Sequence, residues 1–288
     1  MMDKKQQFFE SYDIAAVIGC YRFGSTAMAK MIAAHYAKHR DLHGKSAMFV
    51  DELLNSTQFF MPGTNGGMGY IEPEWVMFGN DKVNLRNHGA TAAHIMDSKF
   101  RWLKHQTKDK KISIKINPPD FTAHGTQLLH THLFDDNRVF KLGLCSQDIG
   151  NALISFAIGM YFNFWIFNEE QYNLEVAKSL QPTQCYLHTV QHYASMVMDH
   201  LNYLLYSADR LEAMVWYEQL TDLSIPEMGM SNSRKSSIYK TPTAHADRAS
   251  TYFTNSEELI ATAADLQLRF DPLLSAVRTA TDHLAYYG

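Results

Sequence analysis

The sequence predicts a three-layer α/β domain in which helices flank a central, mostly parallel β-sheet and the C-terminal portion is predominantly helical. Three observations carry this prediction. Apolar runs of strand length alternate with helical patterns, and a glycine-flanked loop joins the first run to a helix. The chain of 288 residues, 46% hydrophobic and 19% charged, is typical of a globular protein with one sizeable core. We therefore expect a single domain over residues 1–288, with its core at about 14–260.

The first strand is expected at residues 14–18, followed by a loop at 19–25 and a helix at 26–37. Ala27, Met31 and Ala34 would share one apolar face of this helix. Later apolar runs of strand length are 47–50, 112–116, 139–144 and 214–217. Each run precedes a polar or loop-forming segment, and three precede a plausible helix, so the pattern predicts four or five parallel strands.

Charge and cysteine content argue against several classes of protein. A net charge of -4 and a pI near 6.4 provide no overall basic field, so we expect no nucleic-acid partner. Cys20, Cys145 and Cys185 are too few and too scattered for a disulfide framework or a four-ligand zinc site, and they favour a reducing compartment. The polar N-terminus lacks a signal peptide, and the apolar stretch 152–167 falls short of a membrane span. Cytoplasmic localisation is the expectation.

The strongest local pattern is VIGCYRFGSTAMAKMI, at residues 17–32. Gly19 and Gly24 have the spacing of GxxxxGK[ST], but Ser25 stands where a nucleotide triphosphatase has its lysine. Such a loop presents backbone N–H groups at the positive end of a helix dipole, which is a ready phosphate site. Arg22 can grip a phosphate or sulfate in a bidentate way, and the hydroxyls of Ser25 and Thr26 can donate to the same anion.

A plainer interpretation is a turn that needs glycine for its backbone angles, with Thr26 capping the helix. The strand before the loop, the helix after it and Arg22 within it favour the anion site.

These residues resemble a known family. Arg22, Phe23, Gly24, Ser25 and Thr26 match R-x-G-[ST]-[ST] after a hydrophobic strand, and this is similar to the 5'-phosphosulfate loop of sulfotransferases. The resemblance implies a P-loop-type fold. It also implies 3'-phosphoadenosine 5'-phosphosulfate (PAPS) as cosubstrate, an unidentified hydroxyl-bearing acceptor, and binding of the donor by these five residues.

Three further segments resemble the family in the same order along the chain. Residues 112–119 (ISIKINPP) are similar to a strand that ends in a lysine, here Lys115, and a proline-containing turn. Residues 139–165 resemble the strand-loop-helix that binds the 3'-phosphate, most closely in the bacterial glycolipid-type and tyrosylprotein-type pattern, with Ser155 among the matched positions. Residues 216–229 are similar to a late strand with a YE-x-L ending. The resemblance covers about residues 14–260.

The chain departs from the family at the second nucleotide motif, where Ser146 and Gln147 occupy the place of an arginine. Ser155 keeps one hydroxyl donor, but loss of the arginine would weaken binding about tenfold to a hundredfold. Compensation is expected from Lys141 or from a basic stretch that includes Arg234 and Lys235. Two alternatives stay open: the nucleotide differs, or Ser146 and Gln147 are a polar strand end in solvent rather than ligands.

Sulfuryl transfer needs a base that removes the proton of the acceptor hydroxyl. In the resembled enzymes a glutamate shortly after the second strand is the usual candidate, so we prefer Glu52, with Asp51 close behind. Ends of parallel strands meet at one edge, which suits this role. Lys115 is a candidate donor to the bridging or sulfonate oxygens. The plain alternatives are a favourable carboxylate at a helix start and a solvated lysine.

No metal site is expected. His124, His130 and His132 fall in a likely helix that would point the last two to different faces, which favours surface or packing roles. His188 and His192 share a helix face near Asp199 but lack a third ligand of obvious spacing.

Taken together, the residues favour a PAPS-dependent sulfotransferase. A P-loop phosphotransferase is the first alternative, and a degenerate nucleotide-binding or assembly module is the second. Residues 62–70 (PGTNGGMGY) predict a loop that could cover the site and help to bind the acceptor.

Overall fold

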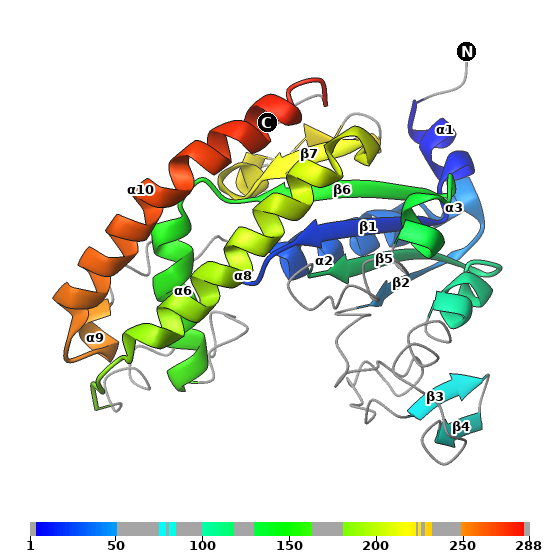
Figure 1. Ribbon diagram of the computed structural model, residues 1–288. Helices are drawn as coiled ribbons and strands as arrows, with labels where there is room; N and C mark the ends of the chain where they lie inside the picture. Colours follow the sequence, from blue (N-terminus) through cyan, green and yellow to red (C-terminus); the bar gives the residue numbers. More distant parts are fainter. Residues whose placement is uncertain are drawn as a thin grey trace.

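The structure is a computed structural model that describes residues 4–50, 75–78, 81–84, 100–117, 130–162, 181–222, 224–225, 228–231 and 249–284. Its centre is a five-stranded parallel sheet (Figure 1). The strands lie in the order β2 (Ser46–Val50), β5 (Lys110–Ile116), β1 (Ile14–Gly19), β6 (Val139–Cys145) and β7 (Ala213–Trp216). The predicted α/β class and all five predicted strands are confirmed, with bounds that differ by at most two residues.

Burial explains why the inner strands could be recognised. Every residue of β1 and of β6 is buried, because each strand has a neighbour on both sides and helices over both faces. Ile14 at the start of β1 aligns with Ile112 of β5 and with Val139 of β6. A strand covered on both faces reads as a continuous apolar run rather than as an alternating pattern.

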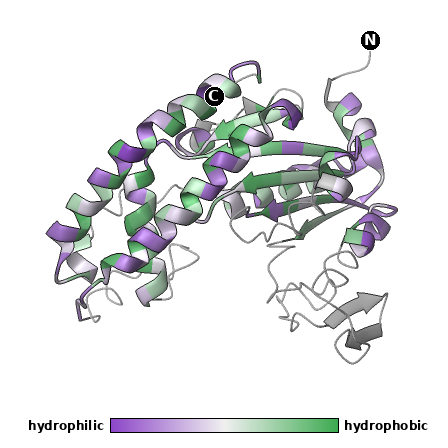
Figure 2. Ribbon diagram, in the orientation of Figure 1, coloured by the Kyte–Doolittle hydropathy of each residue, from purple (hydrophilic) through white to green (hydrophobic). Residues whose placement is uncertain are grey.

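Helices cover the sheet on both faces, giving three layers. On one face, α1 (Lys4–Ser11) and α2 (Ser25–Lys38) pack on a cluster that includes Ala15 and Val17 of β1. On the other face, Ile14, Ala16 and Ile18 join a larger cluster with α6 (Ile149–Phe162), α8 (Leu187–Tyr206), α9 (Ala249–Tyr252) and α10 (Ser256–Ala280). Figure 1 shows α6 and α10 extending beyond the carboxyl ends of the strands, and Figure 2 shows the strands and α6 to be mainly hydrophobic. The helical C-terminal portion is therefore as expected.

A charge cluster closes the amino edge of the sheet. The Asp13 carboxylate, just before β1, accepts hydrogen bonds from Lys45, Lys111 and Arg138. The Lys111 ammonium is buried and also donates to the carbonyls of Phe9 and Tyr12. Burial raises the pKa of Asp13, but the three cationic donors together outweigh it and lower the pKa to about 2.

The remaining elements are short. They are α3 (Arg40–His43), β3 (Trp75–Phe78), β4 (Asp81–Asn84), the π-helical turn η3 (His130–Phe134), the 3-10 helices η4 (Ala208–Arg210) and η5 (Tyr217–Asp222), β8 (Ser224–Ile225) and β9 (Met230–Ser231). His132 in η3 stacks on Phe100, with ring centroids 4.9 Å apart, so it has a packing role. The loop expected at 62–70 lies outside the described residues. Among the helices within them, none combines the length and apolar character needed to cross a membrane.

Candidate functional site

The candidate site lies where the chain leaves the two central strands in opposite directions. From β1 the chain crosses through α2 to β2, on one side of the sheet, whereas from β6 it continues through α6 and α8 to β7 on the other side. In open α/β sheets, ligands bind outside the carboxyl ends of the strands at such a switch point. The glycine-flanked loop after β1 and the segment after β6 meet there.

The backbone of the loop after β1 is tightly constrained. Arg22 and Gly24 both adopt left-handed backbone angles, with φ values of 64° and 78°. The side chains of Cys20 and Phe23 are fully buried, and the Phe23 N–H donates to the Cys20 carbonyl. Phe23 therefore uses both its side chain and its N–H to hold the loop, and this placement does not support the predicted role in binding a ligand.

Close packing explains why position 24 is glycine. A Cβ atom added to Gly24 would lie 2.6 Å from Cδ2 of Tyr217 and 2.7 Å from Cδ1 of Leu220. The left-handed φ of Gly24 also disfavours any side chain. Gly24 thus lets η5, which follows β7, approach the loop directly.

The first turn of α2 is suited to an anion. Gly24 is its N-cap, so no side chain caps the helix, and the first turn contains no acidic residue. Ser25 is buried, with its hydroxyl 3.5 Å from the Cys20 carbonyl, and Thr26 is half-buried on the same turn. A helix N-terminus without an internal anion leaves its N–H groups and positive dipole end for a ligand.

Arg22 and Ser155 are brought together although they are distant in sequence. The Arg22 Nε atom donates to the Ser155 hydroxyl oxygen of α6 at 2.7 Å. The resemblance assigned these residues to opposite ends of a nucleotide, one to the 5'-phosphosulfate and the other to the 3'-phosphate. In the fold they are direct neighbours, so one anion could contact both.

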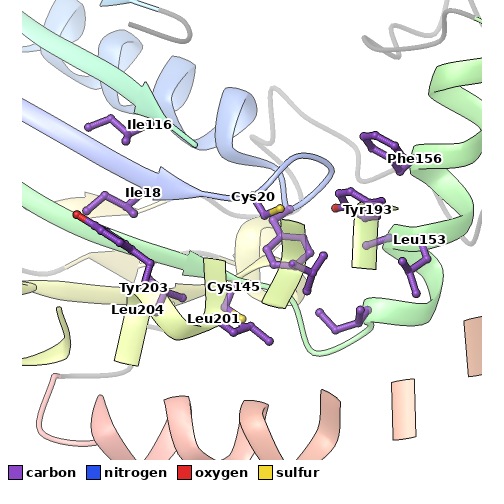
Figure 3. Packing of buried hydrophobic residues seen from close by; sticks show 14 of the residues in the cluster. Ile18, Cys20, Ile116, Cys145, Leu153, Phe156, Tyr193, Leu201, Tyr203 and Leu204 are labelled. Carbon is purple, nitrogen blue, oxygen red and sulfur yellow. The ribbon is translucent and has the colours of Figure 1, made fainter. Parts of the chain in front are cut away.

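The core beneath this contact is aromatic. Figure 3 shows Cys20, Tyr193 and Phe156 close together at the end of β1. Phe156 of α6 stacks on Tyr193 of α8 with ring centroids 4.1 Å apart, and the Tyr193 hydroxyl donates to the Tyr21 carbonyl. The loop therefore rests on a packed platform from α6 and α8.

The segment after β6 already binds a carboxylate of the chain itself. One carboxylate oxygen of Glu218, in η5, accepts hydrogen bonds from the Ser146 hydroxyl at 2.7 Å, from the Gln147 N–H at 3.0 Å and from the Asp148 N–H at 3.3 Å. Ser146 is buried, so the alternative of a strand end in solvent is wrong for this residue, whereas Gln147 is exposed. The YE-x-L pattern is visible in the sequence, but this contact of Glu218 is not.

Lys141 cannot replace the missing arginine near Ser146. Its ammonium is buried and lies 2.9 Å from the Glu212 carboxylate. It precedes Ser146 by five residues, about 16 Å along an extended strand. The expected compensation by Lys141 is therefore wrong.

Lys115 lies beside the loop, as the prediction requires. It is buried, and its ammonium is 5.5 Å from the centroid of the Tyr21 ring. Two residues later, Asn117 is also buried, and within the described structure neither amide atom of its side chain has a hydrogen-bond partner. Asn117 was not predicted as a site residue, although it stands between Lys115 and the two prolines of ISIKINPP.

His200 supports the end of β6 from α8. It is fully buried, its Nε2 atom lies 2.9 Å from the Leu144 carbonyl, and its ring meets the Phe23 ring edge to face. Burial lowers the pKa of His200 to about 4, against the opposing effect of the backbone hydrogen bond. The ring is therefore neutral at pH 7, and Nε2 is the atom that donates to the carbonyl.

Four predicted site residues lie outside the described residues: Asp51, Glu52, Arg234 and Lys235. Val50, the last residue of β2, lies at the carboxyl edge of the sheet. Within the described part of the chain, no three histidine, cysteine or carboxylate side chains gather closely enough to hold a metal ion. His188, His192 and Asp199 are all exposed on α8.

Comparison with known proteins gives no match: no family model, no curated protein and no solved structure is significantly similar to this chain. The resemblance to sulfotransferases thus rests on the motifs alone.

Proposed function

We propose that this chain is a nucleotide-dependent sulfotransferase that binds the 5'-phosphosulfate of its donor at the loop after β1. Arg22 would grip the anion, and the hydroxyls of Ser25 and Thr26 and the N–H groups of the first turn of α2 would complete the donor set. The observation that carries the proposal is the left-handed Arg22 at an uncapped helix N-terminus, joined to Ser155 across the switch point.

The electrostatics of the two helix N-termini support this choice of subsite. The N-terminus of α2 has no acidic residue and no side-chain cap, whereas the backbone before α6 is engaged by the Glu218 carboxylate. An incoming anion is therefore favoured at α2 and disfavoured at α6.

The chemistry assigned to the protein is positioning and charge stabilisation. A bound donor supplies a sulfuryl group that is transferred in line from its phosphate oxygen to an acceptor hydroxyl. Lys115, which lies beside the loop, would stabilise charge on the bridging or sulfonate oxygens. Glu52, or Asp51 next to it, would take the proton of the acceptor hydroxyl.

The donor implied by the resemblance is PAPS, and only part of it fits the described residues. Its 5' end suits the loop after β1. Its 3'-phosphate would need donors after β6, but Ser146, Gln147 and Asp148 already donate to Glu218, and Lys141 is engaged by Glu212. No step of the reaction is assigned to that phosphate.

Binding of nucleotides tests the proposal directly. Titration calorimetry with adenosine 3',5'-bisphosphate, AMP, ADP, and ATP with magnesium should detect binding of an adenosine 5'-phosphate, weakened about tenfold to a hundredfold by Arg22→Ala. Arg269→Ala is the matched control, because Arg269 is exposed on α10 and pairs only with Asp265 four residues away among the ion pairs described. Release of sulfate from a nucleotide phosphosulfate, with water as acceptor, would then show the reaction.

The other outcomes are equally informative. Binding that requires ATP with magnesium would support a phosphotransferase instead. Binding without sulfate release would support a nucleotide-binding or assembly module, which the internal anion Glu218 makes a specific second candidate. No binding at all would refute the proposal.

Cytoplasmic localisation belongs to the same proposal. Cys20, Cys145 and Cys185 are buried free thiols, which suits a reducing compartment.

A further inference from the structure

We propose that Glu218 makes this site select a nucleotide whose ribose carries a free 3'-hydroxyl and reject one that carries a 3'-phosphate. This inference rests on the proposed function, since it assumes that a nucleotide occupies the loop after β1. It assigns a specificity-determining role to a residue of η5, which follows β7 and whose carboxylate binds the segment after β6.

The position of Glu218 follows from its own three hydrogen bonds and from the contact that its neighbour Tyr217 makes with the loop after β1. Its carboxylate bridges the hydroxyl of Ser146 and the N–H groups of Gln147 and Asp148, directly after β6. Its neighbour Tyr217 lies against Gly24 of the nucleotide loop, where an added Cβ would approach its ring to 2.6 Å. Glu218 is thus adjacent in sequence to a residue that touches the loop after β1, while its own side chain binds the segment after β6.

A nucleotide at the loop has to extend toward this region. The Nε atom of Arg22 lies 2.7 Å from the hydroxyl oxygen of Ser155, on the second turn of α6. In the proposed complex, the ribose of a nucleotide whose 5'-phosphate lies near Arg22 extends from this turn toward the start of α6. The group that it meets there decides which ribose substituents are accepted.

A ribose hydroxyl and a 3'-phosphate need different partners at that place. A ribose hydroxyl donates a hydrogen bond to a carboxylate, which is how acidic residues recognise ribose in dinucleotide sites, whereas an added phosphate calls for a cationic side chain. Here the polar donors after β6 are already directed at Glu218, and the lysine within β6 is paired with Glu212. A second phosphate placed there would meet the negative charge of Glu218, while the guanidinium of Arg278 lies over the Trp216 ring, 4.9 Å from its centroid.

If Glu218 had a purely structural role, a different result would be expected for its variants. As a cap for the backbone before α6, its carboxylate would stabilise the fold, and its replacement would change stability without changing nucleotide preference. Asp148 already accepts from the Asn151 N–H at 2.9 Å, so the first turn of α6 keeps a cap of its own when Glu218 is replaced. Variants of Glu218 are therefore expected to fold.

The test compares AMP with adenosine 3',5'-bisphosphate, which differ only in the 3'-phosphate, by titration calorimetry. The wild-type protein should bind AMP at least tenfold more tightly than the bisphosphate. Glu218→Gln keeps an acceptor oxygen and removes the charge, so it should lower the ratio of the AMP affinity to the bisphosphate affinity by about tenfold. Glu257→Gln is the control, because it neutralises an exposed carboxylate in the first turn of α10 and should leave the ratio unchanged.

Tighter binding of the bisphosphate by the wild-type protein would overturn the inference and leave the proposed function standing. An unchanged ratio in Glu218→Gln, with thermal unfolding showing a folded protein, would also overturn it. Absence of binding by either nucleotide would overturn the proposed function and the inference together.

Discussion

Replacement of Gly24 by alanine tests the geometry of the candidate site most directly. The new methyl group would lie 2.6 and 2.8 Å from Cδ2 and Cε2 of Tyr217, and 2.7 Å from Cδ1 of Leu220. All three distances are below 3.0 Å, so η5 or the loop has to move. Overpacking of this kind destabilises by about 1–3 kcal/mol, and a non-glycine residue in the left-handed region adds about 1–2 kcal/mol. The expected loss in the free energy of unfolding is therefore about 2–5 kcal/mol.

Gly44→Ala is the matched control for this variant. Gly44 has a similar φ of 70°, but nothing lies within 4 Å of its added Cβ. It should lose only the backbone contribution of about 1–2 kcal/mol. Urea unfolding of both variants measures the difference, which isolates the clash with η5. Equal losses in the two variants would refute the close approach of Tyr217 to the loop.

Two further predictions concern buried charges. Asp13→Asn should lower the free energy of unfolding by about 3–5 kcal/mol, because it strands the buried ammonium of Lys111; a loss below about 1 kcal/mol in urea unfolding would contradict this. His200 should make the protein sensitive to acid. Its pKa falls from 6.5 to about 4 on folding, so the unfolded chain binds more protons between these values. The contribution of neutral His200 to the free energy of unfolding is complete above pH 6.5. About 3 kcal/mol of this free energy is lost as the pH falls toward 4. His200→Gln should flatten this dependence, whereas exposed His188→Gln should not.

The strands were predictable because burial on both faces removes any ambiguity of pattern. In β1 and β6 every residue is buried, so each strand is a continuous apolar run in the sequence and could be predicted from it. The loop after β1 was equally readable, since glycine spacing and the following helix are local features. The sequence also predicted Lys115 near the end of a strand, and the structure brings it beside Tyr21 of that loop.

Contacts between distant segments were not predictable. Glu218 reaches Ser146 across 72 positions of sequence, and His200 reaches Leu144 across 56. Lys141 was misjudged for the same reason, because its partner Glu212 comes from the neighbouring strand end rather than from its own segment. Each depends on the lateral order of the strands, about which a local pattern carries no information.

By itself, the sequence determined the α/β class, the bounds of the five strands to within two residues, and a glycine-flanked loop that contains Arg22 between the first strand and the following helix. These features depend on burial and backbone angles within short segments. Only the tertiary structure decided the order β2-β5-β1-β6-β7, and with it the switch point at which Arg22 meets Ser155 and Glu218 closes the start of α6. The physical reason is that strand order and side-chain partners follow from how crossover helices pack on the two faces of the sheet.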